Sequence, residues 1–141
     1  MLTAVMVLGM AALCTLHMAA GKQERKLDQA GKCANAFVPV CNWDDIPEGR
    51  AKVVALNGER IAVFRHAGQV SALSNVCRHQ NGPLGEGKII NGCVTCPWHG
   101  YQYFPDTGIS PPPFEDSVPT YPAKVVNGQV LVQPTPRGSL P

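Results

Sequence analysis

The sequence predicts a small all-β domain, an antiparallel β-sandwich or barrel with a loop-rich subdomain. From residue 37 onward the apolar runs are short, as in strands, and Gly-containing turns separate them. Pairs such as Asn57-Gly58 and Asn127-Gly128 tolerate the positive φ angles that tight hairpins need. The 141 residues include 14 Gly and 13 Pro, a composition that favours turns over long helices and a length that suits one domain.

The expected strands follow one another along the chain. "FVPVCNWDDIPEG" indicates a strand and a turn, and "AKVVALNGERIAVFRHAGQVSALSN" contains three apolar runs with turns at Asn57-Gly58 and Gly68. Gly, Pro and Asp dominate residues 80–113, which predicts loops, and "YPAKVVNGQVLVQ" closes with a hairpin at Asn127-Gly128. We therefore assign the folded domain to residues 37–133 and a flexible tail to residues 134–141.

The N-terminal run "MLTAVMVLGMAALCTLHMAA" contains no acidic or strongly basic side chain. About 20 apolar residues can span a bilayer as a helix, and the basic start and Ala-x-Ala-like exit of a signal peptide are missing. We predict a single transmembrane helix over residues 1–20 and a polar linker over residues 21–36. Because Lys22, Arg25 and Lys26 follow the run, the positive-inside rule predicts a cytoplasmic domain. The alternative is an amphipathic or poorly ordered extension.

Charge and cysteine content narrow the possible partners and cofactors. The net charge of +2 comes without a basic cluster beyond the short "KQERK" run, so we expect no nucleic-acid binding. Three of the six Cys lie between residues 77 and 96 and alternate there with His. This clustering favours metal ligation in a reducing compartment over a disulfide framework.

The potential metal ligands form two pairs. Cys77 and His79 give one C-x-H pair, Cys96 and His99 give one C-x-x-H pair, and sixteen residues separate His79 from Cys96. A structural zinc site built from Cys77, Cys93, Cys96 and one His uses suitable residue types. However, C-x-H fits zinc-ribbon spacing poorly, and the second His would have no role.

The two pairs resemble the signature of Rieske-type ferredoxins. The resemblance extends through "VCRHQNGPLGEGKIINGCVTCPWHGYQYFPDTGISPPPFEDSVPTYPAKVVNGQVLV" and covers about residues 37–132, without the apolar run. It implies a Rieske-type sandwich or barrel with a cluster-binding subdomain and one 2Fe-2S cluster per chain. In that family two Cys hold one iron and two His the other, which implies Cys77 with Cys96, and His79 with His99. Cys93 is outside the pattern and is expected to pack as a small apolar residue in a strand.

The resemblance also implies roles for residues beside the ligands. High-potential Rieske proteins join the two cluster loops by a disulfide, which cannot form here because Gly82 and Trp98 occupy its positions. They place a Ser, bonded to a bridging sulfide, where Tyr101 stands, and a Tyr, bonded to a ligand sulfur, where Tyr103 stands. With two of the three features absent, we expect a reduction potential in the lower half of the Rieske range of about −150 to +300 mV, raised somewhat by Tyr103.

Small and apolar residues complete the expected cluster environment. Four glycines are expected to let backbone amides reach the sulfurs: Gly82, Gly85, Gly87 and Gly100. "SPPPF", with Pro112 at its centre, resembles the proline-rich loop that covers the cluster in this family. Four residues are expected to ring the exposed His edges as an apolar docking patch: Pro83, Leu84, Pro112 and Phe114.

The function that the resemblance implies is one-electron transfer by a membrane-tethered ferredoxin-like carrier. Its expected partners are redox proteins, a donor reductase and an acceptor, together with the membrane. Rieske oxygenases carry a further domain with a mononuclear iron, and because nine residues follow Val132 we expect no such site in this chain.

Three alternatives also fit the sequence. The chain resembles the electron-entry part of an oxygenase, including the membrane-anchored sterol type, and the small subunits of assimilatory nitrite reductases. Met1 could also be internal to a longer multi-spanning redox protein, with the apolar run as its last helix.

Overall fold

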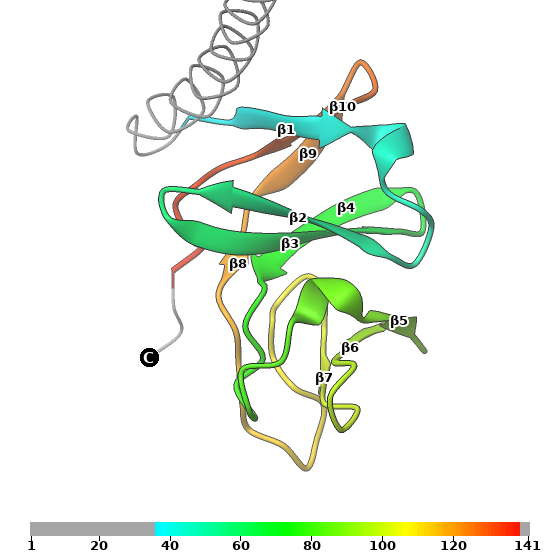
Figure 1. Cartoon of the computed structure of the whole chain (residues 1–141), viewed down its shortest axis with the longest axis vertical. Coiled ribbons are helices and arrows are strands. Elements are labelled where there is room, and N and C mark those ends of the chain that lie inside the picture. Colours follow the sequence, from blue (N-terminus) through cyan, green and yellow to red (C-terminus); the bar gives the residue numbers. More distant parts are fainter. Residues whose placement is uncertain (1–35, 139–141) are drawn as a thin grey trace, which may run out of the picture.

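The computed structural model describes residues 36–138 and confirms the all-β prediction (Figure 1). The described residues form ten strands and two short 3-10 helices: β1 (Val38–Asn42), η1 (Trp43–Asp45), β2 (Ala51–Leu56), β3 (Glu59–His66), β4 (Gln69–Ser74), η2 (Leu84–Glu86), β5 (Lys88–Ile90), β6 (Cys93–Thr95), β7 (Gln102–Tyr103), β8 (Thr120–Tyr121), β9 (Ala123–Val126) and β10 (Gln129–Val132).

The predicted membrane helix, nearly all of the predicted linker and the last three residues of the predicted tail lie outside the described residues. Within residues 36–138, no helix has the length and apolar character needed to cross a bilayer.

The predicted hairpins form where the sequence places them. Asn57 and Gly58 have φ angles of 50° and 78° between β2 and β3, and Asn127 and Gly128 have 50° and 74° between β9 and β10. Two successive residues at positive φ match the right-handed twist of the flanking strands. The same geometry at Asn91-Gly92 joins β5 to β6. The segment over residues 80–113 is rich in loops, as predicted, but it also contains three short strands that were not predicted, and Asn91-Gly92 is the local signal for the hairpin of the first two.

Three antiparallel sheets are stacked as successive layers (Figure 1). Strands β1, β10 and β9 form the first sheet, β2, β3, β4 and β8 the middle sheet, and β5, β6 and β7 a small third sheet. Long loops surround the third sheet at the end of the molecule opposite the first sheet. The layers therefore place the predicted ligands, which lie on these loops, away from β1.

Strand β3 divides the interior into two cores. Ile61 and Val63 join a first core between the first and middle sheets, and Ala62 and Phe64 join a second core with the third sheet and its loops. This alternation follows from the period of two along a strand. All four side chains are fully buried, and burying a Val, Ile or Phe side chain contributes roughly 1.5–3 kcal/mol. The middle sheet is thus the base on which the ligand loops are built.

Candidate metal centre

Two loops carry the predicted ligands, and each is closed by backbone hydrogen bonds. In the first loop, residues 75–83, the Cys77 amide donates to the Gly82 carbonyl and the Asn81 amide to the Cys77 carbonyl, both at 2.9 Å. In the second loop, residues 96–101, the Cys96 amide donates to the Tyr101 carbonyl at 2.7 Å. These bonds fix the turn that follows each Cys, so the later His of each pair is held at a defined position relative to it.

The two residue types of the predicted ligand set lie at different depths. Cys77 and Cys96 are 0% and 2% exposed and belong to the second core. His79 and His99 are exposed, and their ring centroids lie 5.1 Å apart in an edge-to-face arrangement. The fold thus brings together two thiols on the interior side and two imidazoles on the solvent side, from separate loops.

The backbone at His99 adopts a left-handed conformation. His99 has a φ of 66° and the following Gly100 a φ of 74°. His is among the residues that enter the left-handed region more readily than most, yet such a conformation still costs on the order of 1–3 kcal/mol. A Cβ at Gly100 would meet no atom within 4 Å. Gly100 is therefore explained by its dihedral angle and not by a close neighbour.

Burial controls the ionisation of the thiol in the second loop. It raises the pKa of Cys96 to about 11, against the opposing effect of an amide hydrogen bond from Trp98, and the Cys77 thiol beside it raises the pKa further. A thiol must lose its proton to bind a metal ion. At neutral pH the metal-free Cys96 side chain therefore carries a proton that metal binding would release.

Tyr103 lies fully buried against the first loop. Its hydroxyl accepts a hydrogen bond from the Arg78 amide at 3.1 Å and lies 3.4 Å from Cys77 Sγ. Because a metal-bound thiolate has no proton, the phenol hydrogen is the one that can bridge this pair. Burial, reinforced by Cys77, raises the pKa of Tyr103, which keeps that hydrogen in place.

Gly82 and Trp98 join the two loops by packing. A Cβ on Gly82 would lie 2.8 Å from Cys96 Sγ and 3.2 Å from the Cβ and Cδ2 atoms of Trp98. The absence of a side chain at residue 82 therefore makes room for both the sulfur and the indole. These are the two positions at which high-potential Rieske proteins are expected to have a disulfide. In this chain they are neighbours in space and are held by close contact.

Two of the other expected glycine roles are corrected by the structure. The Gly85 amide donates to Asn75 Oδ1 at 2.7 Å, and the Gly87 amide donates to the Leu84 carbonyl at 3.0 Å. Neither amide is available to a sulfur. A Cβ at Gly85 would collide with Val53, and one at Gly87 with the Thr95 carbonyl. Both glycines therefore serve close packing onto β2 and β6.

Tyr101 makes ring contacts that the sequence did not indicate. Its ring is stacked on His79, with centroids 4.2 Å apart and planes 9° apart. It also meets Phe114 at 5.0 Å with the rings tilted by 45°. Phe114 belongs to the proline loop, residues 110–114, so Tyr101 connects this loop with the first loop.

The expected apolar patch is partly corrected. Leu84 is fully buried in the second core and cannot contribute to a surface. Pro112 is exposed and Pro83 half-buried. The large apolar side chains that remain exposed on the three loops are Val76, Trp98 and Phe114, at 45%, 48% and 48%.

Cys93 is buried in β6, which confirms the expectation of a packed strand residue. Its neighbour Val94 faces the second core together with Cys77 and Cys96. Successive side chains of a strand point to opposite faces, so Cys93 lies on the other face of β6. The zinc alternative needs Cys93 beside the other two thiols, and this arrangement argues against it.

The donor set fits a two-iron cluster. Two thiols and two imidazoles converge from facing loops, and Gly82 leaves space at the Cys96 sulfur. Among residues 36–138, no three His, Cys, Asp or Glu side chains are grouped to share one metal ion. In a Rieske cluster each iron has two protein ligands, which matches two thiols and two imidazoles.

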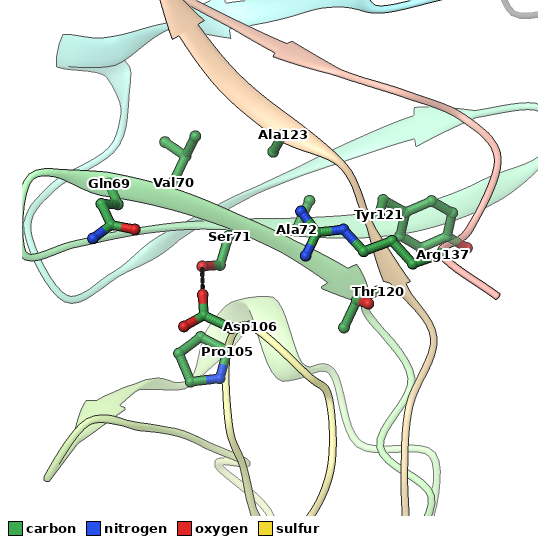
Figure 2. A pocket seen from close by; sticks show the side chains of 10 residues that line it. All are labelled: Gln69, Val70, Ser71, Ala72, Pro105, Asp106, Thr120, Tyr121, Ala123 and Arg137. Carbon is green, nitrogen blue, oxygen red and sulfur yellow. Dashed lines mark hydrogen bonds between the residues drawn. The ribbon is translucent and has the colours of Figure 1, made fainter. Parts of the chain in front are cut away.

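Two cavities lie apart from these ligands. Figure 2 shows one of about 130 Å³ between β4 and the segment with Pro105 and Asp106, where Ser71 Oγ lies 3.2 Å from Asp106 Oδ1. Another of about 340 Å³ shares Thr120 and Arg137 with it. None of the four predicted ligands lines either cavity.

Comparison with protein families gives a match over residues 36–122 to the Rieske [2Fe-2S] domain. The ferredoxin component of the naphthalene 1,2-dioxygenase/salicylate 5-hydroxylase systems of Ralstonia sp is 32% identical over 99 residues, which cover 65% of this chain and 95% of the relative. Cholesterol 7-desaturase nvd 1 of Ciona intestinalis is 31% identical over 106 residues, which cover 70% of this chain. The match spans 23% of the length of that desaturase.

Among solved structures, a chain in the complex of reduced oxygenase and oxidized ferredoxin of carbazole 1,9a-dioxygenase superposes with a TM-score of 0.66 at 26% identity. The match covers 73% of this chain and 97% of the other.

Proposed function

This chain belongs to the Rieske [2Fe-2S] domain family, and from that premise we propose how its residues serve one-electron transfer through a Rieske 2Fe-2S cluster. Cys77 and Cys96 bind one iron, and His79 and His99 bind the other. The observation that carries this assignment is the depth of the four side chains, since each loop supplies one buried thiol and one exposed imidazole.

The cluster supplies a one-electron redox couple. With two thiolates and two neutral imidazoles, it is formally neutral when oxidised and carries one negative charge when reduced, which is easier to accommodate than the charge of an all-Cys cluster. Hydrogen bonds from the chain to the ligand sulfurs stabilise the added negative charge. The Trp98 amide donates to the Cys96 sulfur, and the Tyr103 hydroxyl donates to the Cys77 sulfur.

The reduction potential lies in the lower half of the Rieske range of about −150 to +300 mV. Hydrogen bonds to the sulfurs and solvent access set the potential of such a cluster. Gly82 and Trp98 meet by packing without a disulfide, and the Tyr101 ring stacks on His79. Tyr103 supplies the potential-raising hydrogen bond that remains.

The partner-docking face consists of the exposed His rings and the apolar side chains of Val76, Trp98 and Phe114. Exposed apolar surface beside a redox centre favours short-lived contact with another protein. The expected partners are a reductase as donor and an oxygenase-type protein as acceptor. Support comes from relatives whose names describe ferredoxin components of oxygenase systems.

A single transmembrane helix at residues 1–20, with the Rieske domain on the cytoplasmic side, is compatible with this docking face. Strand β1, which follows the tether, lies in the first sheet, and the ligand loops lie at the opposite end of the molecule (Figure 1). Anchoring at the end that contains β1 would leave the ligand loops, and the cluster they hold, accessible to partner proteins. The tether is tested by comparing how the full chain and residues 36–141 alone partition into membranes. Equal partition of the two proteins would refute the proposed tether.

A second candidate is a redox module of a larger oxygenase. It is favoured by the match to part of cholesterol 7-desaturase, of which this chain covers 23%. The mass of the native polypeptide distinguishes a carrier of this length from a longer enzyme.

The decisive test of the cluster assignment is EPR of the dithionite-reduced protein, with iron and sulfide assays. We expect two irons and two sulfides per chain and a reduced-cluster signal. His79→Cys and His99→Cys should each lower the potential, since thiolate replaces imidazole. A zinc-loaded, EPR-silent protein would end the carrier proposal.

A further inference from the structure

Tyr101 touches all three loops that surround the predicted ligands. Its carbonyl accepts the Cys96 amide at 2.7 Å within the second loop. Its ring lies face to face with His79 of the first loop at 4.2 Å, and on the proline loop it meets Phe114 at 5.0 Å. Among the described residues, no other side chain on these loops makes ring contacts with both a predicted ligand and the proline loop.

The two imidazoles are therefore held differently. His79 has an aromatic ring on one face and the edge contact with His99. Within residues 36–138, the ring contact of His99 is that edge contact alone, and positive φ angles at His99 and Gly100 shape its backbone. One imidazole thus has a stacked ring on its face, whereas the other has none among the described residues.

We propose that Tyr101 is a positioning residue for His79: its ring fixes the plane of that imidazole and keeps water from one of its faces. The proposal rests on the function proposed above, in which His79 is a ligand. Stacked aromatic pairs prefer defined geometries and stabilise each other beyond the area they bury. The nearly parallel planes and the support of Phe114 on the Tyr101 ring restrict the rotation of His79 about its side-chain bonds.

Two consequences follow for the loaded protein. Without the ring, the His79 imidazole samples more orientations, so the magnetic coupling of its nitrogen to the reduced cluster becomes heterogeneous. Water also reaches the cluster from that side and stabilises the charged reduced form more than the neutral oxidised form, which raises the potential.

The test compares Tyr101→Ala and Tyr101→Phe with Phe37→Ala, in the full chain with its cluster. Phe37 is a half-buried aromatic residue whose ring contact is with Lys124 in the first sheet, far from the ligands. Three quantities are measured: the nitrogen couplings from pulsed EPR, the midpoint potential and the rate of cluster loss to a chelator.

In Tyr101→Ala we expect broadening of one of the two imidazole couplings, a higher potential, and cluster loss faster by about two- to tenfold. Tyr101→Phe keeps the flat ring and should restore all three values, and Phe37→Ala should leave them unchanged. If the alanine variant does not fold, Tyr101→Leu keeps apolar volume without a flat ring and should broaden the same coupling.

Unchanged couplings and potential in Tyr101→Ala, equal broadening of both couplings, or failure of Tyr101→Phe to restore them would overturn the proposal. Absence of a reduced-cluster signal in the unmodified protein would instead refute the proposed function, so the two failures are distinguishable.

Discussion

The two ends of the molecule are stabilised in different ways. The sandwich end, made of the first and middle sheets around the first core, contains long paired strands such as the eight-residue β3. The cluster end, made of the third sheet, the three loops and the second core, contains strands of two or three residues. Its core includes two thiols and the buried Tyr103 beside aliphatic side chains.

We therefore expect the cluster end to depend on its cofactor more than the sandwich end does. Strands of two or three residues provide little regular pairing, and binding free energy at a metal site contributes to folding. The sandwich end can be stabilised by hydrophobic burial and regular strand pairing alone.

The largest expected loss of stability comes from truncating buried side chains on the two faces of β3. Ile61→Ala opens a cavity in the first core and should lower the free energy of unfolding by about 2–5 kcal/mol, and Phe64→Ala in the second core by about 3–5 kcal/mol. Urea unfolding measures both. Only Phe64→Ala should also speed cluster loss, since its core contains the two thiols. Equal cluster loss in both variants would contradict the separation of the cores.

Removal of the cluster by a chelator under reducing conditions should loosen one end selectively. Hydrogen exchange of the amides in β5–β7 should accelerate by about a hundredfold, whereas β2–β4 should remain protected. Exchange that rises uniformly over all strands would show that the two ends unfold as one unit.

Gly82→Ala tests the contact between the first and second loops. Its Cβ would lie 2.8 Å from Cys96 Sγ, and overpacking of this kind costs about 1–3 kcal/mol. We expect less iron per chain and a lower thermal midpoint. Gly138→Ala is the matched control, since a Cβ there meets nothing within 4 Å. Full iron content in Gly82→Ala would show that the loops move apart easily.

Tyr103→Phe removes one hydrogen bond to Cys77 and keeps the ring. If that bond favours the reduced state by about 1 kcal/mol, the midpoint potential should fall by about 40 mV. Redox titration measures the shift, and an unchanged potential would eliminate this role of Tyr103.

Cys93→Ala should have the smallest effect. Loss of a buried sulfur from β6 should cost about 1 kcal/mol of stability or less and leave iron content and potential unchanged. Iron loss in this variant would restore a ligand role for Cys93.

Much of the fold was predictable because its signals are local. Asn-Gly pairs adopt positive φ through short-range sterics, so the hairpins at Asn57-Gly58 and Asn127-Gly128 are found where the sequence placed them, and the turn predicted at Gly68 forms with Ala67 and Gly68 both at positive φ. The fourth, at Asn91-Gly92, carries the same signal but was obscured by the surrounding Gly and Pro residues. The cluster type was implied by the resemblance of the Cys and His pairs to the Rieske signature, and the family match agrees with it.

The sequence by itself determined the all-β class, the hairpins at Asn57-Gly58 and Asn127-Gly128 and the two pairs of potential ligands, because each depends on residues near one another in the chain. Only the tertiary structure decided which side chains surround those ligands. The stacking of Tyr101 on His79, the burial of Leu84 and the Asn75 side-chain acceptor of the Gly85 amide all join separate segments. Such contacts depend on how the layers pack, and no short stretch of sequence contains that information.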